Sequence, residues 1–271
     1  MASKIISILG CGWVGLPLGK MLLEDGYHVK GSGTSTKTFD QLKDAQIEPY
    51  LITCRPELHG EDIDEFFKAD VLVVTIPFKR DLANPYFYKE QIDSVIGHVH
   101  QSPIRFVILT SSTSVYPDTN REVSEHDTFV AVDPRAEVLL ATENDLMSSK
   151  FFYSTIVRFA GLYGYDRKPG RFLAGQRNIG SGNSRVNFIH RDDAVGILRE
   201  IIRQDVQGEI FNGCSDKHPT RREFYIKAAQ NLGLPAPEFD ETIAAKYKIV
   251  DNSKVKERLN YYFKYPDPMK G

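Results

Sequence analysis

The sequence predicts an α/β fold, in which a doubly wound parallel sheet is joined to a small C-terminal lobe. Over the first 164 residues, short apolar runs rich in β-branched residues alternate with amphipathic segments, as parallel strands alternate with crossover helices. A glycine-rich turn lies between the first apolar run and the first amphipathic segment. The stretch 237–268 is more polar and more aromatic, which indicates a lobe separate from the sheet.

The start of the sheet follows directly from local patterns. The run KIISIL (4–9) is apolar, β-branched and ended by glycine, which is typical of a buried strand. A helix is expected over about 16–25, because Pro17 is tolerated in a first turn and Gly26 ends the pattern. The segment HVKGSG (28–33) is the second expected strand.

The rest of the sheet continues the same alternation. Thr38 and Gln41 fit a capping box that opens a helix after the second strand. The further expected elements are a strand at 69–77, a helix at 86–99, a strand at 105–112, a helix at 135–148 and a strand at 154–164.

The composition is that of an ordinary globular protein, with 41% hydrophobic and 26% charged residues. A net charge of −2 gives no reason to expect nucleic acid or an anionic membrane as a partner. No apolar run reaches the roughly 18 residues of a membrane helix, and glycines and Pro17 break the apolar start, so no signal peptide is expected. Three scattered cysteines without CxxC spacing predict a cytoplasmic protein with neither disulfides nor a metal site.

The turn LGCGWVG (9–15) has GxGxxG spacing between a strand and a helix. In a Rossmann fold this position binds the pyrophosphate of a dinucleotide. Gly10 then makes the tight turn, Gly12 lets the backbone approach the pyrophosphate, and Gly15 allows the helix and strand to pack closely. The helix amino terminus adds N–H groups and a positive dipole end. The alternative is a turn that binds nothing, and the strand–turn–helix setting favours the dinucleotide.

The stretch GSGTSTK (31–37) indicates which dinucleotide is bound. Rossmann proteins that bind NAD carry an acidic residue here for the ribose hydroxyls, and this stretch has no Asp or Glu. Three hydroxyl side chains and a lysine suit a 2′-phosphate instead, so NADP is the expected cofactor and NAD the alternative. The other interpretation is a turn that only caps the next helix. The full predicted cofactor site is Gly10, Gly12, Trp13, Val14, Gly15, Thr34, Ser35, Thr36, Lys37 and Pro77.

Four more segments carry a family resemblance: SSTSVYP (111–117), VRFAGLYG (157–164), VNFIHRDDAVGIL (186–198) and GEIFNGCSDKHPTRREFYIKAAQNLG (208–233). With the glycine turn, they make the chain resemble, from about residue 4 to 235, an extended short-chain dehydrogenase/reductase of the NAD-dependent epimerase/dehydratase kind. The opening GCGWVGLPLG and the short chain are most similar to an atypical subgroup, the bacterial YeeZ-like proteins.

The resemblance implies a catalytic Ser or Thr on a strand, and a Tyr and a Lys four residues apart on the next helix. Ser112 matches the first residue, four positions before Tyr116. Arg135 stands at the tyrosine position and Leu139 at the lysine position. Arginine does not exchange protons near neutrality, and leucine neither binds a ribose nor lowers a phenol pKa. The usual YxxxK pair is therefore absent, and turnover of ordinary carbonyls is expected to be slow or absent.

Any hydride chemistry would then take its proton from Tyr163, from Tyr116 or from water held by Ser112. Tyr163 is either a displaced acid or a packing tyrosine, and Ser112 either binds a substrate carbonyl or only ends a strand. His190 titrates near neutrality, although its segment resembles a structural corner of the family, in which one of the two following aspartates caps a helix.

Two arginines are the predicted substrate-binding residues. Arg135 offers a permanent positive charge to a carboxylate or phosphate; the alternative is an ion pair with Asp133 or Glu137. In the basic segment RKPGRF, Arg171 or Arg167 either binds an anion or belongs to a solvated loop.

These assignments predict the organisation of the chain. Residues 1–164, joined by 188–213, form the dinucleotide-binding domain, and residues 165–187 with 214–271 form the small substrate lobe. We expect an NAD(P)-dependent oxidoreductase or epimerase-like enzyme with a non-standard active site, acting on a small, anionic carbonyl or sugar substrate. One alternative is a sensor or scaffold that binds NADP without turnover, and another is an enzyme whose acid comes from the small lobe. The sequence leaves the oligomeric state open, a homodimer included.

Overall fold

The computed structural model describes residues 4–78, 84–240, 242–243 and 246–270. These residues form two compact units that interleave along the chain. Unit 1 takes the described residues of 1–115, 131–158 and 198–210, and unit 2 those of 116–130, 159–197 and 211–271. The domain boundaries expected from the sequence stay a prediction.

Within the described residues, eight strands form one sheet in the order β11-β8-β6-β5-β1-β2-β3-β4. They are β1 (Ile5–Leu9), β2 (His28–Gly33), β3 (Glu48–Cys54), β4 (Leu58–Gly60), β5 (Val71–Val74), β6 (Phe106–Ser112), β8 (Tyr153–Phe159) and β11 (Ile210–Gly213). The pairs β1–β2, β1–β5, β2–β3 and β5–β6 are parallel, and β4 is antiparallel to β3. The strand order reverses at β1 and β5, so the predicted doubly wound fold is confirmed.

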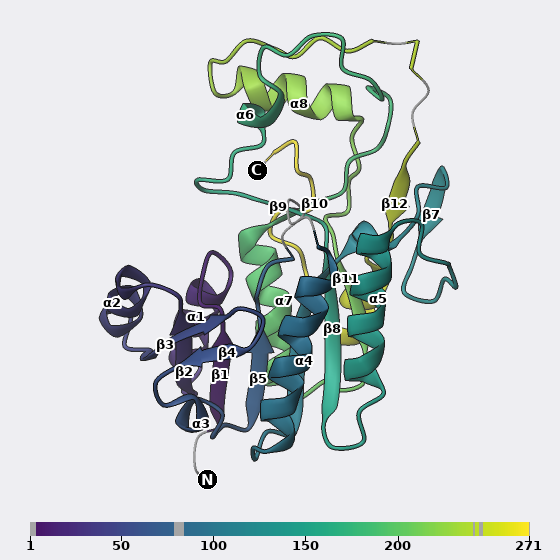
Figure 1. Ribbon diagram of the computed structural model, residues 1–271. Helices are drawn as coiled ribbons and strands as arrows, with labels where there is room; N and C mark the ends of the chain where they lie inside the picture. The colour runs from purple at the N-terminus through teal and green to yellow at the C-terminus, as the bar shows by residue number, and fades with distance from the viewer. Residues whose placement is uncertain (1–3, 79–83, 241, 244–245, 271) are drawn as a thin grey trace. The chain divides into compact units, whose positions relative to one another are not determined.

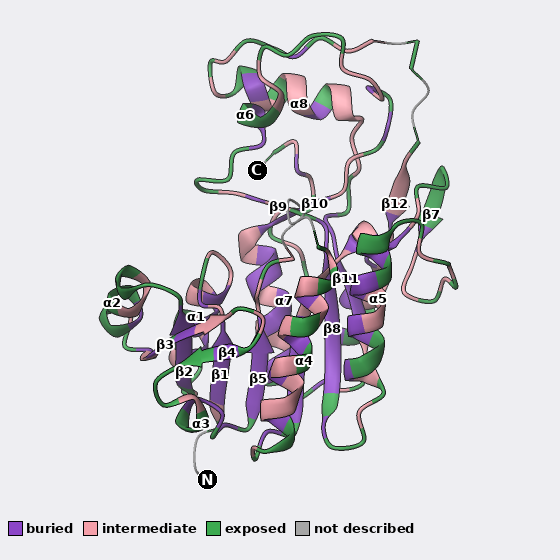
Figure 2. Cartoon of the chain, in the orientation of Figure 1, coloured by how far each residue is buried: buried purple, intermediate pink, exposed green. Residues whose placement is uncertain are grey.

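Helices cover the sheet on both faces. They are α1 (Gly15–Glu24), α2 (Thr36–Asp44), α3 (Ile63–Phe66), α4 (Tyr86–His100), α5 (Pro134–Met147) and α7 (Arg191–Arg203), with a 3-10 turn at Thr113–Val115. Figure 1 shows α4 and α5 side by side on the sheet face toward the viewer. On α7, Arg199 Nε donates to the Asp25 carboxylate at the end of α1, at 2.6 Å. The central strands are almost entirely buried (Figure 2).

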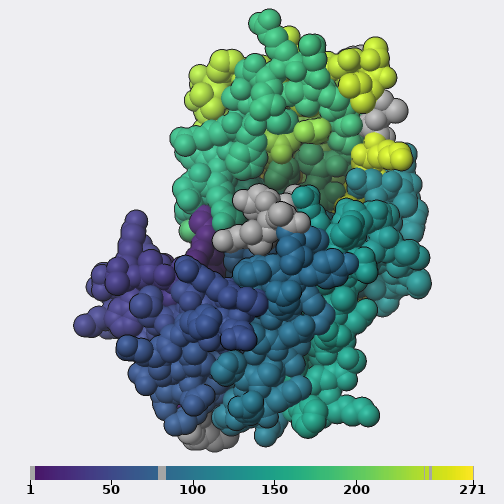
Figure 3. All heavy atoms as spheres, in the orientation of Figure 1, coloured from purple at the N-terminus to yellow at the C-terminus, as the bar shows by residue number. Residues whose placement is uncertain are grey.

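The helix α2 begins earlier than the sequence pattern predicts. Ser35 is its N-cap, with an extended backbone, and its Oγ accepts a hydrogen bond from the backbone N–H of Thr38 at 3.3 Å. The predicted cap at Thr38 is therefore wrong, because Ser35 already satisfies that N–H group. Figure 3 shows the α2 region projecting from the surface of unit 1.

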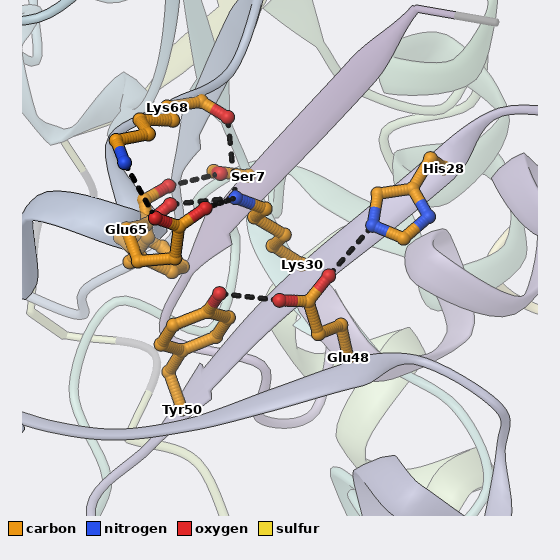
Figure 4. Close-up of polar contacts among 8 residues, drawn as sticks. Ser7, His28, Lys30, Glu48, Tyr50, Glu65 and Lys68 are labelled. Carbon is orange, nitrogen blue, oxygen red and sulfur yellow. Dashed lines mark hydrogen bonds and ion pairs between the residues drawn. The ribbon is translucent and has the colours of Figure 1, made fainter. Parts of the chain in front are cut away.

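A buried lysine ties the sheet to the short helix α3 (Figure 4). The Lys30 side chain is only 5% exposed. Its Nζ donates to the carbonyl oxygens of Glu65 at 2.6 Å and Lys68 at 3.2 Å, and Ser7 Oγ donates to the carbonyl of Phe66 at 2.6 Å. Carbonyls at the end of a helix lack partners inside it, so these two side chains complete the C-terminus of α3.

Unit 2 is built from two small parallel sheets and three helices of its own, among the described residues. The sheets pair β9 (Gly161–Tyr163) with β10 (Phe188–His190) and β7 (Arg121–Val123) with β12 (Lys248–Val250). The helices are α6 (Gly170–Leu173), α8 (Arg221–Gln230) and α9 (Ser253–Leu259). Tyr163, Phe188 and Phe224 form an aromatic core cluster.

Candidate functional site

The glycine turn after β1 is held in place from two sides. Gly10 has a φ of +96°, a conformation that favours glycine. Its N–H donates to Ser32 Oγ on β2 at 2.9 Å, and Thr75 Oγ1 after β5 donates to its carbonyl at 2.6 Å. The turn therefore lies between the carboxyl ends of β1 and β5, where the strand order reverses and doubly wound proteins bind their ligands.

The glycines at 12 and 15 are required for different reasons. A Cβ at Gly15 would lie 2.8 Å from the carbonyl oxygen of Gly10 and 3.1 Å from Thr75 Oγ1, so only glycine fits. A Cβ at Gly12 would approach nothing closer than the Gly10 carbonyl, at 3.9 Å, and Gly12 is exposed. The described protein atoms therefore give no steric reason for glycine at position 12, whereas a phosphate bound closely against the backbone would supply one.

The amino terminus of α1 fits an anion. Val14 occupies the N-cap position and makes no side-chain hydrogen bond to the first turn. No acidic residue lies in that turn, so nothing on the helix opposes its positive dipole end. Trp13 and Val14 are half-buried beside the turn, and Pro77 is exposed in the segment that follows β5.

The segment predicted to bind the adenosine ribose follows β2 directly. Thr34, Ser35, Thr36 and Lys37 are all exposed. The hydroxyl of Ser35 is engaged as the α2 cap, and it also lies 3.1 Å from Thr38 Oγ1. Thr34, Thr36 and Lys37 therefore remain as the side chains available to a phosphate at this edge of the sheet.

The two positions that replace the YxxxK pair lie on α5 in different environments. Arg135 is exposed in the first turn, whereas Leu139 is 1% exposed and belongs to the core. The Asp133 carboxylate accepts hydrogen bonds from the backbone N–H groups of Arg135 and Ala136, at 2.8 and 2.9 Å. No ion pair links the Arg135 guanidinium to Asp133 or Glu137, both of which the structure describes, and the two expected roles of Arg135 stay predictions.

Ser112 lies half-buried at the end of β6, and its Oγ accepts a hydrogen bond from the N–H of Ser114 at 3.1 Å. The neighbouring Ser111, which sequence reasoning missed, donates to the Glu143 carboxylate on α5. Glu143 in turn pairs with Arg158 on β8. This strand–helix network orders the region around Ser112 and leaves the Ser112 hydroxyl proton free to point elsewhere.

The two candidate tyrosines of unit 2 differ in their hydrogen bonds. The Tyr116 hydroxyl is buried and donates to Asn212 Oδ1 at 2.9 Å, which gives it a structural partner. The Tyr163 side chain is 4% exposed, and its hydroxyl has no hydrogen-bond partner among the described residues. Burial raises the pKa of Tyr163 above its ordinary value, so this phenol donates a hydrogen bond but does not ionise near neutral pH.

The corner around His190 is organised by Asp193, whose role the sequence pattern did not reveal. Asp193 is fully buried. Its carboxylate accepts hydrogen bonds from the Tyr261 hydroxyl at 3.0 Å and from the N–H groups of Lys264 at 2.7 Å and Tyr265 at 3.0 Å. It therefore holds the C-terminal segment, and the expectation that Asp192 or Asp193 caps a helix stays a prediction. Burial lowers the pKa of His190, so its imidazole is neutral.

The basic loop 167–172 places its two arginines differently. Arg167 lines a cavity within unit 2, whereas Arg171 is exposed on α6 and is not among the residues that line it. Among the described residues, no cluster of three or more His, Cys, Asp or Glu side chains is arranged to hold a metal ion. In the same part of the chain, no helix has both the length and the apolarity needed to cross a membrane.

Comparison with known proteins shows the family and the fold of this chain. No model of a known protein family matches it. It is 34% identical to protein YeeZ of Escherichia coli K12 over 269 residues, which cover 98% of each chain. Among solved structures it is similar to a short-chain dehydrogenase/reductase superfamily protein from Agrobacterium tumefaciens with bound NAD (TM-score 0.78, 16% identity, 98% of this chain and 94% of that one). It is also similar to UDP-glucuronic acid 4-epimerase from Bacillus cereus in complex with NAD (TM-score 0.78, 18% identity, 98% and 95%). The chain therefore belongs to the YeeZ family and has the fold of the short-chain dehydrogenase/reductase superfamily.

Proposed function

We propose that this protein binds NADP through the glycine turn of unit 1 and acts on a small, anionic carbonyl or sugar substrate. The observation that carries the dinucleotide site is the contrast between Gly15, which internal packing requires, and Gly12, which it does not. A backbone that stays uncovered at Gly12 matches the close approach of a pyrophosphate. The NAD found in structures of the same fold supports the class of ligand.

The residues around the turn have separate tasks in this proposal. The N–H groups at the start of α1, next to Trp13 and Val14, hold the pyrophosphate. Pro77, after β5, borders the dinucleotide on its other side. When bound, NADP supplies a hydride acceptor, and the protein contributes binding and orientation.

The preference for NADP rests on the end of β2. No carboxylate stands among residues 31–37 to bind the two ribose hydroxyls, and Lys37 is exposed with no ion-pair partner in the described part of the chain. Thr34 and Thr36 add hydroxyl donors beside it. A 2′-phosphate is the ligand group that uses a lysine and two hydroxyls together.

A second candidate, an NADP-binding sensor or scaffold without turnover, is favoured by one observation. Leu139 is buried in the core at the position of the missing lysine, so no side chain there lowers a phenol pKa. Ser112 is left to bind a carbonyl, and Arg135 is left exposed to bind an anion. We therefore propose slow turnover at most, since general acid catalysis contributes about 10²- to 10⁴-fold to ordinary enzymes.

The compartment proposed for this chemistry is the reducing cytoplasm. The described thiols of Cys11, Cys54 and Cys214 are free, and burial raises the pKa of the Cys11 thiol to about 12. A buried thiol of that pKa forms little thiolate and is slow to oxidise.

The test of the dinucleotide site is the pair Gly12→Val and Gly97→Val. A Cβ meets no atom within 4 Å at Gly97 and only one, at 3.9 Å, at Gly12, so both variants should fold and melt close to the native protein. We expect Gly12→Val to abolish the NADPH fluorescence titration and Gly97→Val to leave it intact. Equal NADPH binding by the two variants would disprove the site.

A further inference from the structure

A cavity of about 280 Å³ lies within unit 2 and does not involve the glycine turn. Four separate segments build its wall: the loop 163–170, His190, the part of α8 and its end from Phe224 to Leu232, and Pro268 with Met269. Figure 1 shows two of these elements, α6 and α8, next to each other. The volume is close to the lower end of the range for small-molecule sites, about 300–1,000 Å³.

Tyr163 forms part of the cavity wall, and its hydroxyl is a buried donor that no described residue uses. Tyr163 is only 4% exposed. An unsatisfied buried hydroxyl costs roughly 1–3 kcal/mol. A ligand that accepts a hydrogen bond from this hydroxyl would recover that cost.

A second donor faces the same space. His190 Nδ1 accepts a hydrogen bond from the N–H of Asp192 at 3.2 Å, so the neutral ring carries its proton on Nε2. Nε2 makes no hydrogen bond to another described residue, and it lies against Gly164, where a Cβ would overlap it. Gly164 has a φ of +119°, and the ring of Tyr265 packs against the imidazole, with centroids 3.7 Å apart and the two planes tilted by 31°.

The charged residues that line the cavity are all basic, while Asp192 lies behind the lining, with its carboxylate 3.9 Å from His190 Nδ1. Arg167, Lys168 and Lys227 line the cavity, and all three residues are exposed. Among the described lining residues there is no Asp or Glu. The remaining wall is largely apolar and includes Phe224, Leu232, Pro268 and Met269.

We propose that this cavity binds an organic monophosphate with a small apolar body. Three cations and two neutral donors suit the several acceptor oxygens and near-double charge of a phosphate, beyond what one carboxylate needs. The apolar wall takes the organic part, and Tyr163 and His190 donate to the phosphate or its ester oxygen. This site is distinct from the proposed dinucleotide site and does not depend on it.

The experiment is calorimetric titration of the full chain with phenyl phosphate, with benzoate and benzyl alcohol as companions. We expect saturable, one-to-one binding of phenyl phosphate, and weaker binding of both companions. Tyr163→Phe should lower the affinity about five- to tenfold without lowering the melting temperature, because it deletes an unsatisfied hydroxyl. Lys227→Gln should lower the affinity about tenfold, and Lys217→Gln, an exposed lysine of unit 2 outside the cavity, should not.

Three results would overturn this assignment. They are the absence of saturable phenyl phosphate binding, affinities unchanged by both Tyr163→Phe and Lys227→Gln, and benzoate binding as tightly as phenyl phosphate. Gly12→Val separates the two sites, since it should abolish NADPH binding and leave phenyl phosphate binding intact. Loss of phenyl phosphate binding in Gly12→Val would instead locate that ligand at the glycine turn, against the cavity.

Discussion

Arg158 and Glu143 form a buried ion pair, in which Nη2 lies 2.6 Å and Nε 3.0 Å from Glu143 Oε2. Their side chains are only 6% and 2% exposed. Removing one partner of such a pair leaves an uncompensated buried charge. We therefore expect Glu143→Gln to lower the free energy of unfolding by about 3–5 kcal/mol in urea denaturation. The exposed Glu137→Gln on the same helix should change it by less than about 0.5 kcal/mol, and equal losses in the two variants would contradict this role.

The Lys30 contacts predict a second stability effect. Lys30→Met keeps the aliphatic stem but leaves the carbonyls of Glu65 and Lys68 without their donor. The expected loss is about 1–3 kcal/mol of unfolding free energy, measured by the same denaturation. Lys20→Met, at an exposed position of α1, is the matched control and should be close to neutral. A neutral Lys30→Met would show that Lys30 does not stabilise α3.

The pair of Asp25 and Arg199 predicts a pH dependence. The hydrogen bond from Arg199 lowers the pKa of Asp25 below its ordinary value. The pair therefore stabilises the fold above the ordinary carboxyl pKa of about 4, and this stability is lost as the pH falls through the lower folded pKa. Because both groups are partly exposed, we expect Arg199→Met to lower the melting temperature by only about 2 °C at pH 7. The difference should shrink below about pH 4, and a difference that grows on acidification would contradict the assignment.

Lys37 predicts the cofactor preference. Lys37→Glu should weaken NADPH binding by about 1–3 kcal/mol, the scale of a lost charge-assisted contact, and leave NADH binding nearly unchanged. Lys43→Glu, in the last turn of the same helix, controls for net charge and should affect neither. Calorimetry decides the point: if the native protein binds NADH as tightly as NADPH, the preference for NADP is wrong.

Restoring the YxxxK motif on α5 should supply the missing catalytic side chains but lower the stability of the fold. Leu139 is 1% exposed, so Leu139→Lys combined with Arg135→Tyr buries an ammonium group and should cost roughly 3 kcal/mol or more. Leu139→Met is the tolerated control. NADPH oxidation against a panel of carbonyls should be slow in the native protein. Brisk native turnover that survives Ser112→Ala with Tyr163→Phe would disprove the proposed placement of the chemistry.

Local sequence patterns predict the first strand, turn and helix well, because these elements depend on interactions between residues close together in the sequence. The strand at β1 and the helix α1 are visible from an apolar run, a proline at position 17 and a glycine forced to a positive φ at position 10. The hairpin of β3 and β4 was not predicted, since its residues EPYLITC and LHG mix apolar, charged and proline positions with no clear period.

The arrangement of the candidate site residues could be predicted from the sequence only where those residues lie within one short segment. The glycine turn needs a single strand–turn–helix unit, and its residues lie together as expected. By contrast, the partner of Tyr116 is 96 residues away, and the isolation of the Tyr163 hydroxyl depends on everything packed around it. Sequence spacing does not reveal such long-range pairings. For the same reason it could not distinguish Arg167, which lines a cavity, from Arg171, which does not.

The hydrogen bonds of the Asp193 carboxylate affect the order in which unit 2 folds during synthesis. The three donors come from residues 68 to 72 positions later in the chain. While those residues are still inside the ribosome, the Asp193 carboxylate has none of its three hydrogen bonds. Because unit 2 buries Asp193 completely, burying the carboxylate without these bonds is costly. Closing this corner before Tyr265 has emerged therefore leaves Asp193 without these three hydrogen bonds.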